Sequence, residues 1–469
     1  MTDEPGRDAR EAREATRGSA IKLAAEIASR LLGLATTLVL IRGLGASDFG
    51  AFGRLSVIAL LLAELGELGL QTLASRALVA GTLSLRSLVR ARLVLASVLC
   101  AVALAGLPWA PVLSPLVLWF ALSGWGEFLG VALRCRGERV AEALLLLCLR
   151  GLGLAAVAAT LGLASGLVAL AWALALSTLP ALALGAWLLR RSTAAHLVED
   201  TRVAEVMSEA LPLAIHGGLL LLSPRVEFLV LSLLRGDRET GLFLAALRVY
   251  EFLNVVPAGV NAGAMPGLTR EALRGASSVR SRTAWTLAFL AAPAAVGLAL
   301  VAQPLARLLL GPGYEAADYR GTQAPLLLLA LALPALFMNG LLQSTLIAAG
   351  RKGWLPRLTG ARVLIAVLLA VPLVRAGGGI GAASGIALAE WLLLLLAARA
   401  CAAAQAAAPL ARPLVYALAA TLPMALAVWG VRDDLRHAVP LGAAVQLLVT
   451  LAAAKAASGR VTLGDLRYP

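Results

Sequence analysis

Charged side chains recur at helical spacing inside two long apolar segments near the N-terminus. Glu26 and Arg30 are four residues apart in the first segment, and Glu64 and Glu67 are three apart in the second. Both segments are long enough to cross a hydrocarbon layer of about 30 Å at about 1.5 Å per helical residue. Because a charge at the bilayer centre costs roughly 2.5–3.5 kcal/mol, these side chains should face water or other helices. The pattern predicts a polar cavity inside a bundle of spanning helices.

Arginines inside apolar segments could bind a ligand that carries phosphate groups. The planar guanidinium makes two parallel, charge-assisted hydrogen bonds to phosphate oxygens. The candidates of this kind are Arg30, Arg150, Arg225 and Arg248. The alternative for each is an ion pair with a nearby acid. Arg30 is one turn from Glu26 and Arg248 is one turn from Glu251, so both interpretations stay open.

A second set of polar side chains could hold a coupling proton or cation, or line the cavity. This set is Glu26, Glu64, Glu67, Glu127, His216, Glu227, Glu251, Asn254 and Glu390. Glu64, Glu67 and Glu390 are favoured for ion coupling, because no basic residue lies within one turn of them on the same helix. His216 titrates in a suitable range, but a hydrogen bond across helices is its alternative. The four cysteines have no CxxC spacing and no nearby histidines, so no metal site, disulfide or cofactor is expected.

The composition is that of a polytopic membrane protein and excludes a soluble enzyme. The chain has 469 residues, is 60% hydrophobic and has a mean hydropathy of +0.86, which is typical of the membrane class. About fourteen transmembrane helices are expected in this all-α chain. The predicted segments are 20–42, 55–79, 91–110, 114–134, 140–163, 166–189, 210–234, 241–265, 283–302, 324–349, 357–375, 379–399, 410–431 and 438–457.

Alternate loops between these segments are rich in arginine, which predicts the orientation. If the N-terminus is inside, the inner loops contain, among others, Arg86, Arg90, Arg136 and Arg139. The positive-inside rule then predicts a multi-pass protein with both termini cytoplasmic. Residues 1–18 are too highly charged for a cleavable signal peptide. The net charge of +14 is explained by loops near anionic headgroups, so membrane lipids and not nucleic acid are the expected partners.

A weak internal repeat divides the chain into two halves. Residues 48–52 align with residues 239–243 at an offset of 191, each at the turn after the first helix of its half. Six spans separate the copies, so the halves are predicted to be parallel repeats around a central cavity. The expected domains are a cytoplasmic tail (1–18), an N-lobe (19–190), a cytoplasmic linker (191–209), a C-lobe (210–405) and a C-terminal helix pair with its tail (406–469). For that last pair, a lipid groove and a packing role are both open.

Several short motifs occur in an order that resembles one transporter family. They are RGLGASDFGAFG at 42–53, ELGL at 67–70, LPL at 211–213, RVEF at 225–228, GLF at 241–243, LRVY at 247–250, MPGLTR at 265–270, LLLG at 308–311 and AAGR at 348–351. The set resembles the polysaccharide flippases of the multidrug/oligosaccharidyl-lipid/polysaccharide exporter superfamily. Glu227 departs from the pattern, since the family usually has Asp there.

The resemblance implies translocation of a polyprenyl-diphosphate-linked oligosaccharide across the bacterial inner membrane by alternating access. The product would serve the synthesis of O-antigen, capsule or exopolysaccharide, with polysaccharide assembly proteins as further partners and a proton or sodium ion as the coupling ion. The diphosphate would then be the ligand of the four arginines. No ATP-binding loop of the Walker A type is present in the sequence.

Other functions are compatible with parts of the sequence. A flippase for a lipid-linked peptidoglycan precursor and a cation-coupled multidrug antiporter would use the same fold. A drug exporter should favour acids and aromatics over arginines in its cavity. An integral glycan polymerase or ligase would need a large external loop, and the longest predicted outer loop, 303–323, is too short for a domain. The chain is therefore not expected to be an enzyme.

Overall fold

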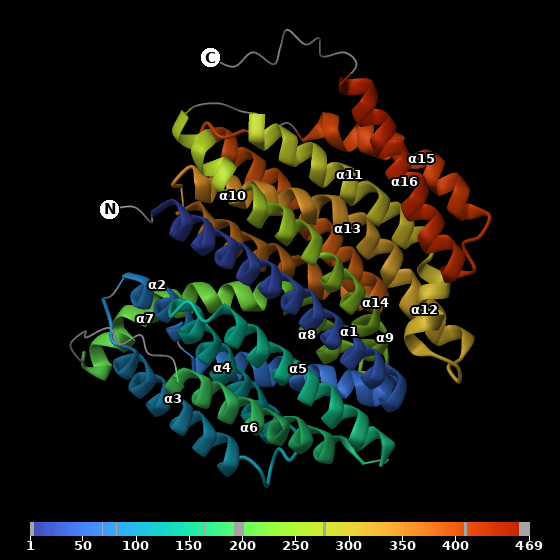
Figure 1. Cartoon of the computed structure of the whole chain (residues 1–469). Helices are drawn as coiled ribbons and strands as arrows, with labels where there is room; N and C mark the ends of the chain where they lie inside the picture. Colours follow the sequence, from blue (N-terminus) through green and yellow to red (C-terminus); the bar gives the residue numbers. More distant parts are fainter. Residues whose placement is uncertain are drawn as a thin grey trace. The chain divides into compact units, whose positions relative to one another are not determined.

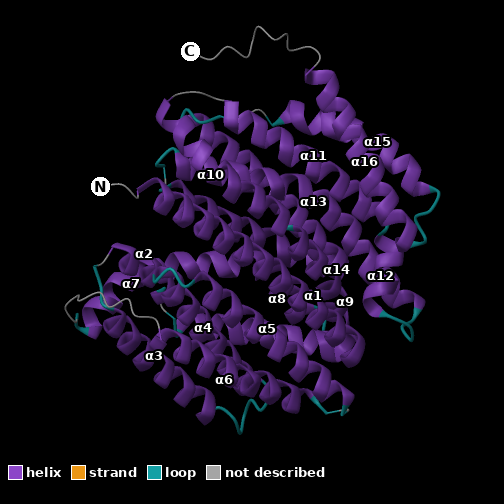
Figure 2. Cartoon of the chain, in the orientation of Figure 1, coloured by secondary structure: helices purple, strands orange, loops and turns teal. Residues whose placement is uncertain are grey.

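The computed structural model describes residues 4–67, 69–80, 82–163, 165–191, 201–274, 278–351, 353–407 and 410–458. These residues form α-helices and one short 3-10 helix, and the described part contains no strand (Figure 2). The all-α prediction is therefore confirmed. In the first helix, side chains are described from residue 24 onward.

Eleven helices among the described residues are long and apolar enough to cross a membrane. Two of them are long helices with a kink. The first covers the predicted span 20–42 and the beginning of 55–79, and the second covers 357–375 and 379–399. The helix from residue 24 to residue 64 bends at Gly45 (φ 76°) and the helix Trp354–Ala403 bends at Gly378 (φ 53°). Positive φ is readily adopted by glycine, which has no Cβ, so each helix can turn there within one continuous element. With these halves counted separately and with the shorter apolar helix Leu435–Leu451, the count agrees with the fourteen predicted spans.

The chain divides into two compact units. The N-terminal unit, Met1–Arg225, contains α1 (Glu4–Leu65), α2 (Leu70–Ala80), α3 (Leu85–Ala105), α4 (Leu113–Cys135), α5 (Arg139–Gly162), α6 (Leu167–Arg191), α7 (Val203–Leu222) and the 3-10 helix η1 (Ser223–Arg225). In this unit α4 is the best covered helix, because α1, α5 and α6 all pack against it. Phe128 and Leu133 of α4 are fully buried in the resulting core.

The C-terminal unit, Val226–Pro469, contains α8 (Val226–Leu234), α9 (Asp237–Leu253), α10 (Val255–Arg274), α11 (Ser278–Leu300), α12 (Ala302–Leu310), α13 (Ala316–Ala348), α14 (Trp354–Ala403), α15 (Ala411–Trp429) and α16 (Leu435–Ser458). Here α13 is the central helix, and α9, α10, α11 and α14 pack around it (Figure 1). The last pair, α15 and α16, packs on α11. This unit therefore has its own core and its own peripheral helix pair.

The second spanning segment of the N-terminal unit is broken. There α1 ends at Leu65 and α2 begins at Leu70, with Gly69 at φ 71° between them. In the C-terminal unit, α9 and α10 meet at Asn254, whose φ of −64° and ψ of −12° are helical, so the segment continues as one apolar span. Interrupted helices are a feature of transporter folds, where they often mark binding sites. Polar groups near the break in the N-terminal unit are therefore of particular interest.

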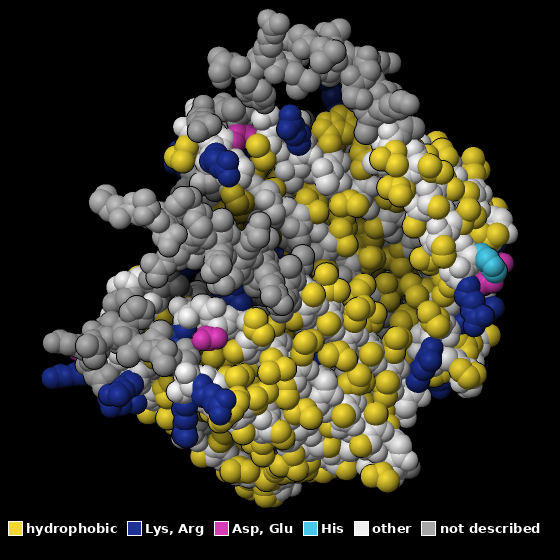
Figure 3. Space-filling model, in the orientation of Figure 1, with side chains coloured by type: hydrophobic (Ala, Val, Ile, Leu, Met, Phe, Trp, Pro, Cys, Tyr) yellow, Lys and Arg dark blue, Asp and Glu magenta, His cyan; other side chains and the backbone are white. Residues whose placement is uncertain are grey.

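The helix exteriors are apolar over much of their length. Leu331, Leu395, Leu422 and Leu426 are among many large hydrophobic side chains that are more than half exposed. On the face shown in Figure 3, hydrophobic side chains make up much of the coloured surface, and Lys and Arg side chains are few. Exposed apolar surface of this extent indicates contact with lipid. The chain is a multi-pass membrane protein.

Three structural expectations stay predictions: the central cavity, the domain boundaries and the cytoplasmic position of the termini. Nine of the nineteen residues of the predicted linker 191–209 lie outside the described residues, and residues 203–209 belong to α7. The end of the C-terminal tail also lies outside the described residues. The predicted span 210–234 is divided in the structure among α7, η1 and α8.

Candidate functional site

In the C-terminal unit, α11, α15 and α16 form a groove of about 1810 Å³, to which α9 and α12 also contribute side chains. Its walls are mostly aliphatic, with three aromatic side chains, Trp285, Phe289 and Tyr416. Trp285 and Tyr416 contact each other across it, with ring centroids 5.8 Å apart. We call this cavity the α11–α15–α16 groove.

One end of the α11–α15–α16 groove is basic. Arg282, in the second turn of α11, and Arg412, in the first turn of α15, both line it. Along α11 the lining runs from Arg282 to Val301, which is about 28 Å at 1.5 Å per residue. One leaflet supplies only about half of a hydrocarbon core of about 30 Å. The groove therefore suits an apolar chain longer than one leaflet, with an anionic group at the arginine end.

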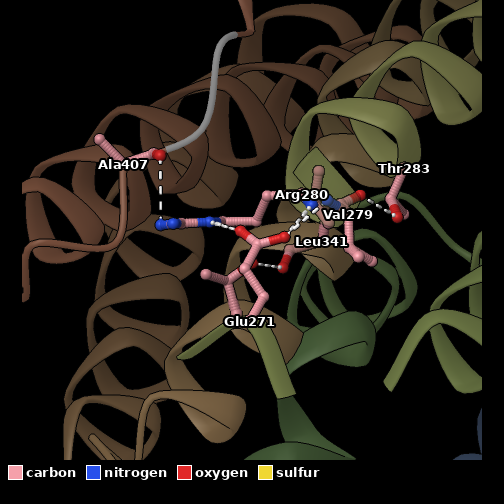
Figure 4. A network of polar contacts seen from close by, with 7 residues as sticks. Glu271, Val279, Arg280, Thr283, Leu341 and Ala407 are labelled. Atoms are coloured by element: carbon pink, nitrogen blue, oxygen red, sulfur yellow. Dashed lines mark hydrogen bonds and ion pairs between the residues drawn. The ribbon is translucent and has the colours of Figure 1, made fainter. Parts of the chain in front are cut away.

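A buried carboxylate fixes the helix ends beside these arginines. Glu271 of α10 is 5% exposed and accepts three hydrogen bonds near the N-terminus of α11 (Figure 4). Its Oε2 accepts from the backbone N–H groups of Val279 (2.6 Å) and Arg280 (2.9 Å), and its Oε1 accepts from Arg280 Nε (2.7 Å). Arg280 also donates to the backbone oxygen of Ala407, in the loop before α15, at 3.3 Å. First-turn N–H groups have no helical partner and favour a negative charge, so Glu271 anchors both elements that present the groove's arginines.

The C-terminal unit also contains a buried polar cluster, which we call the Arg362 cluster. Arg362 NH1 lies 2.9 Å from Glu227 Oε1, and Arg362 Nε donates to Glu390 Oε1 at 3.2 Å. Asn339 Nδ2 donates to Glu390 Oε2 at 2.8 Å. The buried Tyr250 is close enough to these charges for electrostatic interaction with them. Two carboxylates and one guanidinium leave one formal negative charge, which a proton or a monovalent cation could neutralise.

The N-terminal unit has a corresponding cluster beside its broken helix, which we call the Arg92 cluster. Arg92 of α3 is 2% exposed and forms an ion pair with Glu67, which lies in the break between α1 and α2. Its guanidinium lies 5.5 Å from the ring centroid of Trp125 and 5.0 Å from that of Phe128. A Cβ at Gly124 would meet the Glu67 carboxylate and Arg92 NH2. Only glycine therefore allows α4 to approach this ion pair so closely.

The four arginines predicted to bind phosphate lie on different helices and in different surroundings. Arg30 and Arg248 are paired with acids on their own helices, Arg30 with Glu26 at 3.4 Å and Arg248 with Glu251 at 2.7 Å. Arg225, in η1, donates to the backbone oxygen of Leu221 at 3.0 Å. Arg150 is exposed on α5. The ion-pair alternative is thus seen for two of the four, and the ligand role stays a prediction for all of them.

The other predicted site residues are similarly spread. Glu64 is half-buried and close enough to Glu67 for electrostatic interaction. Glu127 is exposed on α4. Asn254 is exposed at the junction of α9 and α10. The side chain of His216 lies outside the described residues. Of the residues favoured for ion coupling, Glu67 and Glu390 both have an arginine partner. The ion-coupling role stays a prediction.

Sequence reasoning missed the partners of these acids. Arg92 is 25 residues from Glu67, and Arg362 is 28 residues from Glu390, so neither pair appears as a spacing along one helix. Asn339, 51 residues from Glu390, was missed for the same reason. The available signal was the presence of Arg92, Arg362 and Asn339 themselves inside predicted spans, where an unpaired polar group is costly.

No protein-family model matches the sequence, and no curated protein matches it. Solved structures do. The chain is similar to the lipid II flippase MurJ in an inward closed conformation, with a TM-score of 0.77, 13% identity, and coverage of 92% of this chain and 98% of that chain. It is also similar to a multidrug resistance MATE family transporter of the MOP superfamily. The inward-facing form gives a TM-score of 0.62 at 16% identity, covering 80% of this chain and 95% of that one, and the outward-facing form gives 0.58 at 18%, covering 83% and 96%.

Identities this low establish similarity of fold and leave the substrate open. The sequence resemblance to a polysaccharide flippase therefore agrees with the fold, and the family stays a prediction. This chain has the fold shared by MurJ and the MATE transporters of the MOP superfamily.

Proposed function

We propose that this protein is a flippase that moves a polyprenyl-diphosphate-linked oligosaccharide across the bacterial inner membrane for surface polysaccharide synthesis. The observation that carries the proposal is the α11–α15–α16 groove, an apolar channel about as long as the hydrocarbon core is thick, with Arg282 and Arg412 at one end. A polyprenyl diphosphate has the matching form, a long apolar chain with anionic phosphates at one end.

The chemistry of the groove suits this substrate better than a small cationic drug. The two arginines at its end would repel a cation, whereas guanidinium groups bind phosphate oxygens through charge-assisted hydrogen bonds. The aromatic pair of Trp285 and Tyr416 lies one turn beyond them, where the chain would begin. In this proposal the lipid enters at the cytoplasmic side, and the headgroup passes to the predicted cavity arginines.

Ion coupling is a separate part of the proposal. Glu64 is the acid we favour for binding a coupling proton or sodium ion, because among the described residues it has no arginine ion pair and lies near Glu67 and Glu127. A site crowded with carboxylates attracts a cation when the surrounding dielectric is low. Binding and release at this site would bias the two units between inward-open and outward-open states.

A flippase for a lipid-linked peptidoglycan precursor is the second candidate. The TM-score of 0.77 to the lipid II flippase MurJ and the coverage of nearly all of both chains favour it. That substrate would also be a lipid diphosphate, so the groove is compatible with both. The two functions differ only in the glycan.

The test is mass spectrometry of polyprenyl-linked glycans from cells with the protein, without it, and with a double variant, Arg282→Ala with Arg412→Ala. We expect a lipid-diphosphate oligosaccharide to accumulate in the deletion and in the double variant. Arg399→Ala, at an exposed arginine of α14 outside the groove, should leave the lipid pool unchanged.

The identity of the accumulated lipid separates the candidates. A peptidoglycan precursor in place of a surface oligosaccharide would establish the second function. An unchanged lipid pool with altered sensitivity to cationic drugs would refute both flippase proposals and favour an antiporter.

A further inference from the structure

A second cavity of the C-terminal unit, of about 410 Å³, lies where α10 packs on α13. Its polar lining consists of four uncharged side chains, Asn254, Asn261, Gln343 and Ser344. We call this cavity the amide pocket. Small-molecule sites commonly measure roughly 300–1,000 Å³, so its volume is that of a binding site for one small ligand unit.

Asn261 is a buried side chain of the amide pocket with an unpaired amide oxygen in the described part of the chain. Its side chain is 7% exposed, and its Oδ1 has no hydrogen-bond partner in the described part of the chain. On the facing helix, a Cβ at Gly340 would lie 2.6 Å from Asn261 Nδ2. Glycine therefore leaves room for this amide. Buried polar atoms are nearly always hydrogen-bonded, so an orphaned amide oxygen at a cavity wall points to a ligand donor.

The chemistry of the lining selects the kind of ligand. Each amide offers both donors and an acceptor, and Ser344 offers a hydroxyl that does both. A ligand rich in hydroxyl groups, which also donate and accept, can pair with all four side chains. Because the lining has no charged side chain, a phosphate or carboxylate would lose its hydration there without compensation. The apolar remainder, which includes Pro257 and Ile347, suits the C–H face of a sugar ring.

The amide pocket follows the predicted phosphate ligand Arg248 along the segment that α9 and α10 form. Arg248 and Asn254 are six residues apart, about 9 Å along the axis. Asn254 is itself the residue between α9 and α10. A diphosphate at Arg248 would therefore be adjacent to the pocket, and the first sugars of a lipid-linked glycan would be within reach of it.

We propose that the amide pocket binds an uncharged, hydroxyl-rich sugar unit of the substrate and so selects the glycan. The inference rests on the proposed function, because it takes the substrate to be a lipid-linked glycan. The phosphate-binding arginines would bind the polyprenyl diphosphate, which all such lipids share. The amide pocket would bind the sugar, which differs among them.

The experiment uses the full chain in lipid nanodiscs and in proteoliposomes with two synthetic probes, polyprenyl diphosphate and the same lipid with one neutral hexose. Native mass spectrometry measures binding in nanodiscs, and a fluorescence-quenching assay measures translocation in proteoliposomes. The variants are Asn261→Leu and Gln343→Leu, which remove hydrogen-bonding groups at nearly constant size. Gln303→Leu, at an exposed position on α12 outside the pocket, is the matched control.

We expect each pocket variant to bind the hexose-bearing lipid about tenfold more weakly than wild type, which is the usual effect of losing one hydrogen bond. Binding of the bare polyprenyl diphosphate should be unchanged, and that result also shows that the variant is folded. Gln303→Leu should bind both probes like wild type.

Three outcomes would count against one or both proposals. Unchanged binding of the hexose-bearing lipid by both variants would overturn the pocket assignment, and so would an equal loss for both probes. Sugar-dependent binding without translocation by wild type would support the pocket and overturn the flippase function. Failure of wild type to bind either lipid would overturn both.

Discussion

Replacement of Arg362 by methionine should strongly destabilise the C-terminal unit. Arg362 is 4% exposed and is the cation that faces Glu227, which is fully buried, and Glu390, which is 8% exposed. Methionine keeps most of the volume, so the main change is the loss of the positive charge. Removing one partner from a buried ion pair typically costs about 3–5 kcal/mol, since the other charge stays buried without compensation.

Most of this cost should come from Glu227. Glu390 keeps its hydrogen bond from Asn339 at 2.8 Å, whereas neither carboxylate oxygen of Glu227 has a well-aligned hydrogen bond in the described structure. A triple variant, Arg362→Met with Glu227→Gln and Glu390→Gln, removes the stranded charges together. It should therefore recover much of the stability that the single variant loses, because replacing a whole buried ion cluster is often nearly neutral.

Thermal unfolding of the purified protein in detergent is the assay. Since membrane proteins commonly unfold irreversibly, the comparison uses the order of midpoints at one scan rate. The expected order is wild type and Arg399→Met highest, the triple variant next, and Arg362→Met lowest. If the triple variant is as unstable as Arg362→Met, the charge argument is wrong and the guanidinium acts by packing.

Three further predictions concern other parts of the molecule. Gly124→Ala should lower stability by about 1–3 kcal/mol, because its Cβ would collide with the ion pair of the Arg92 cluster. Gly151→Ala, whose new Cβ would have nothing within 4 Å, should be neutral or slightly stabilising. The thermal midpoints of the two variants test the difference. Glu271→Ala should cost about 1.5–3 kcal/mol through lost charge-assisted hydrogen bonds, with faster amide exchange confined to the start of α11 and the loop before α15. At the turn between α15 and α16, hydrogen bonds from the His437 ring and from a backbone N–H hold the pKa of Asp434 below its usual value. A lowered carboxyl pKa means that the turn is stabilised at neutral pH and loses this support as the pH falls through the lowered pKa, so Asp434→Asn should abolish the acid dependence of amide protection there.

The helices were largely predictable, because spanning length and hydrophobicity are properties of continuous segments. What the segments did not reveal is where one span passes into the next without a break. Gly45 and Gly378 were expected to lie in or near loops, and both are instead kinks within continuous helices. A glycine at positive φ changes the direction of a helix while the neighbouring residues remain helical, so hydrophobicity alone cannot distinguish the two cases.

The polar interactions were less predictable than the helices. Pairs such as Arg30 with Glu26 and Arg248 with Glu251 follow from helical spacing. The pairs formed by Arg92 and by Arg362 join residues on different helices and depend on how the helices pack. The groove also depends on how the helices pack, since α11, α15 and α16 form its walls together. For the last helix pair the sequence left a lipid groove and a packing role open, and lipid binding there is part of the proposed function.

The distribution of arginines separates structural from ligand-binding roles. Arg92 and Arg362 are almost fully buried and are neutralised by carboxylates of the chain, so they have little to offer a phosphate. Arg282 and Arg412 are exposed and line a cavity, so a phosphate can reach them. A phosphate that binds an exposed guanidinium displaces only water and counterions into solvent, so no buried ion pair has to be broken. A search for the substrate's phosphate site should therefore begin with the exposed arginines, and the buried ones should be tested as determinants of stability.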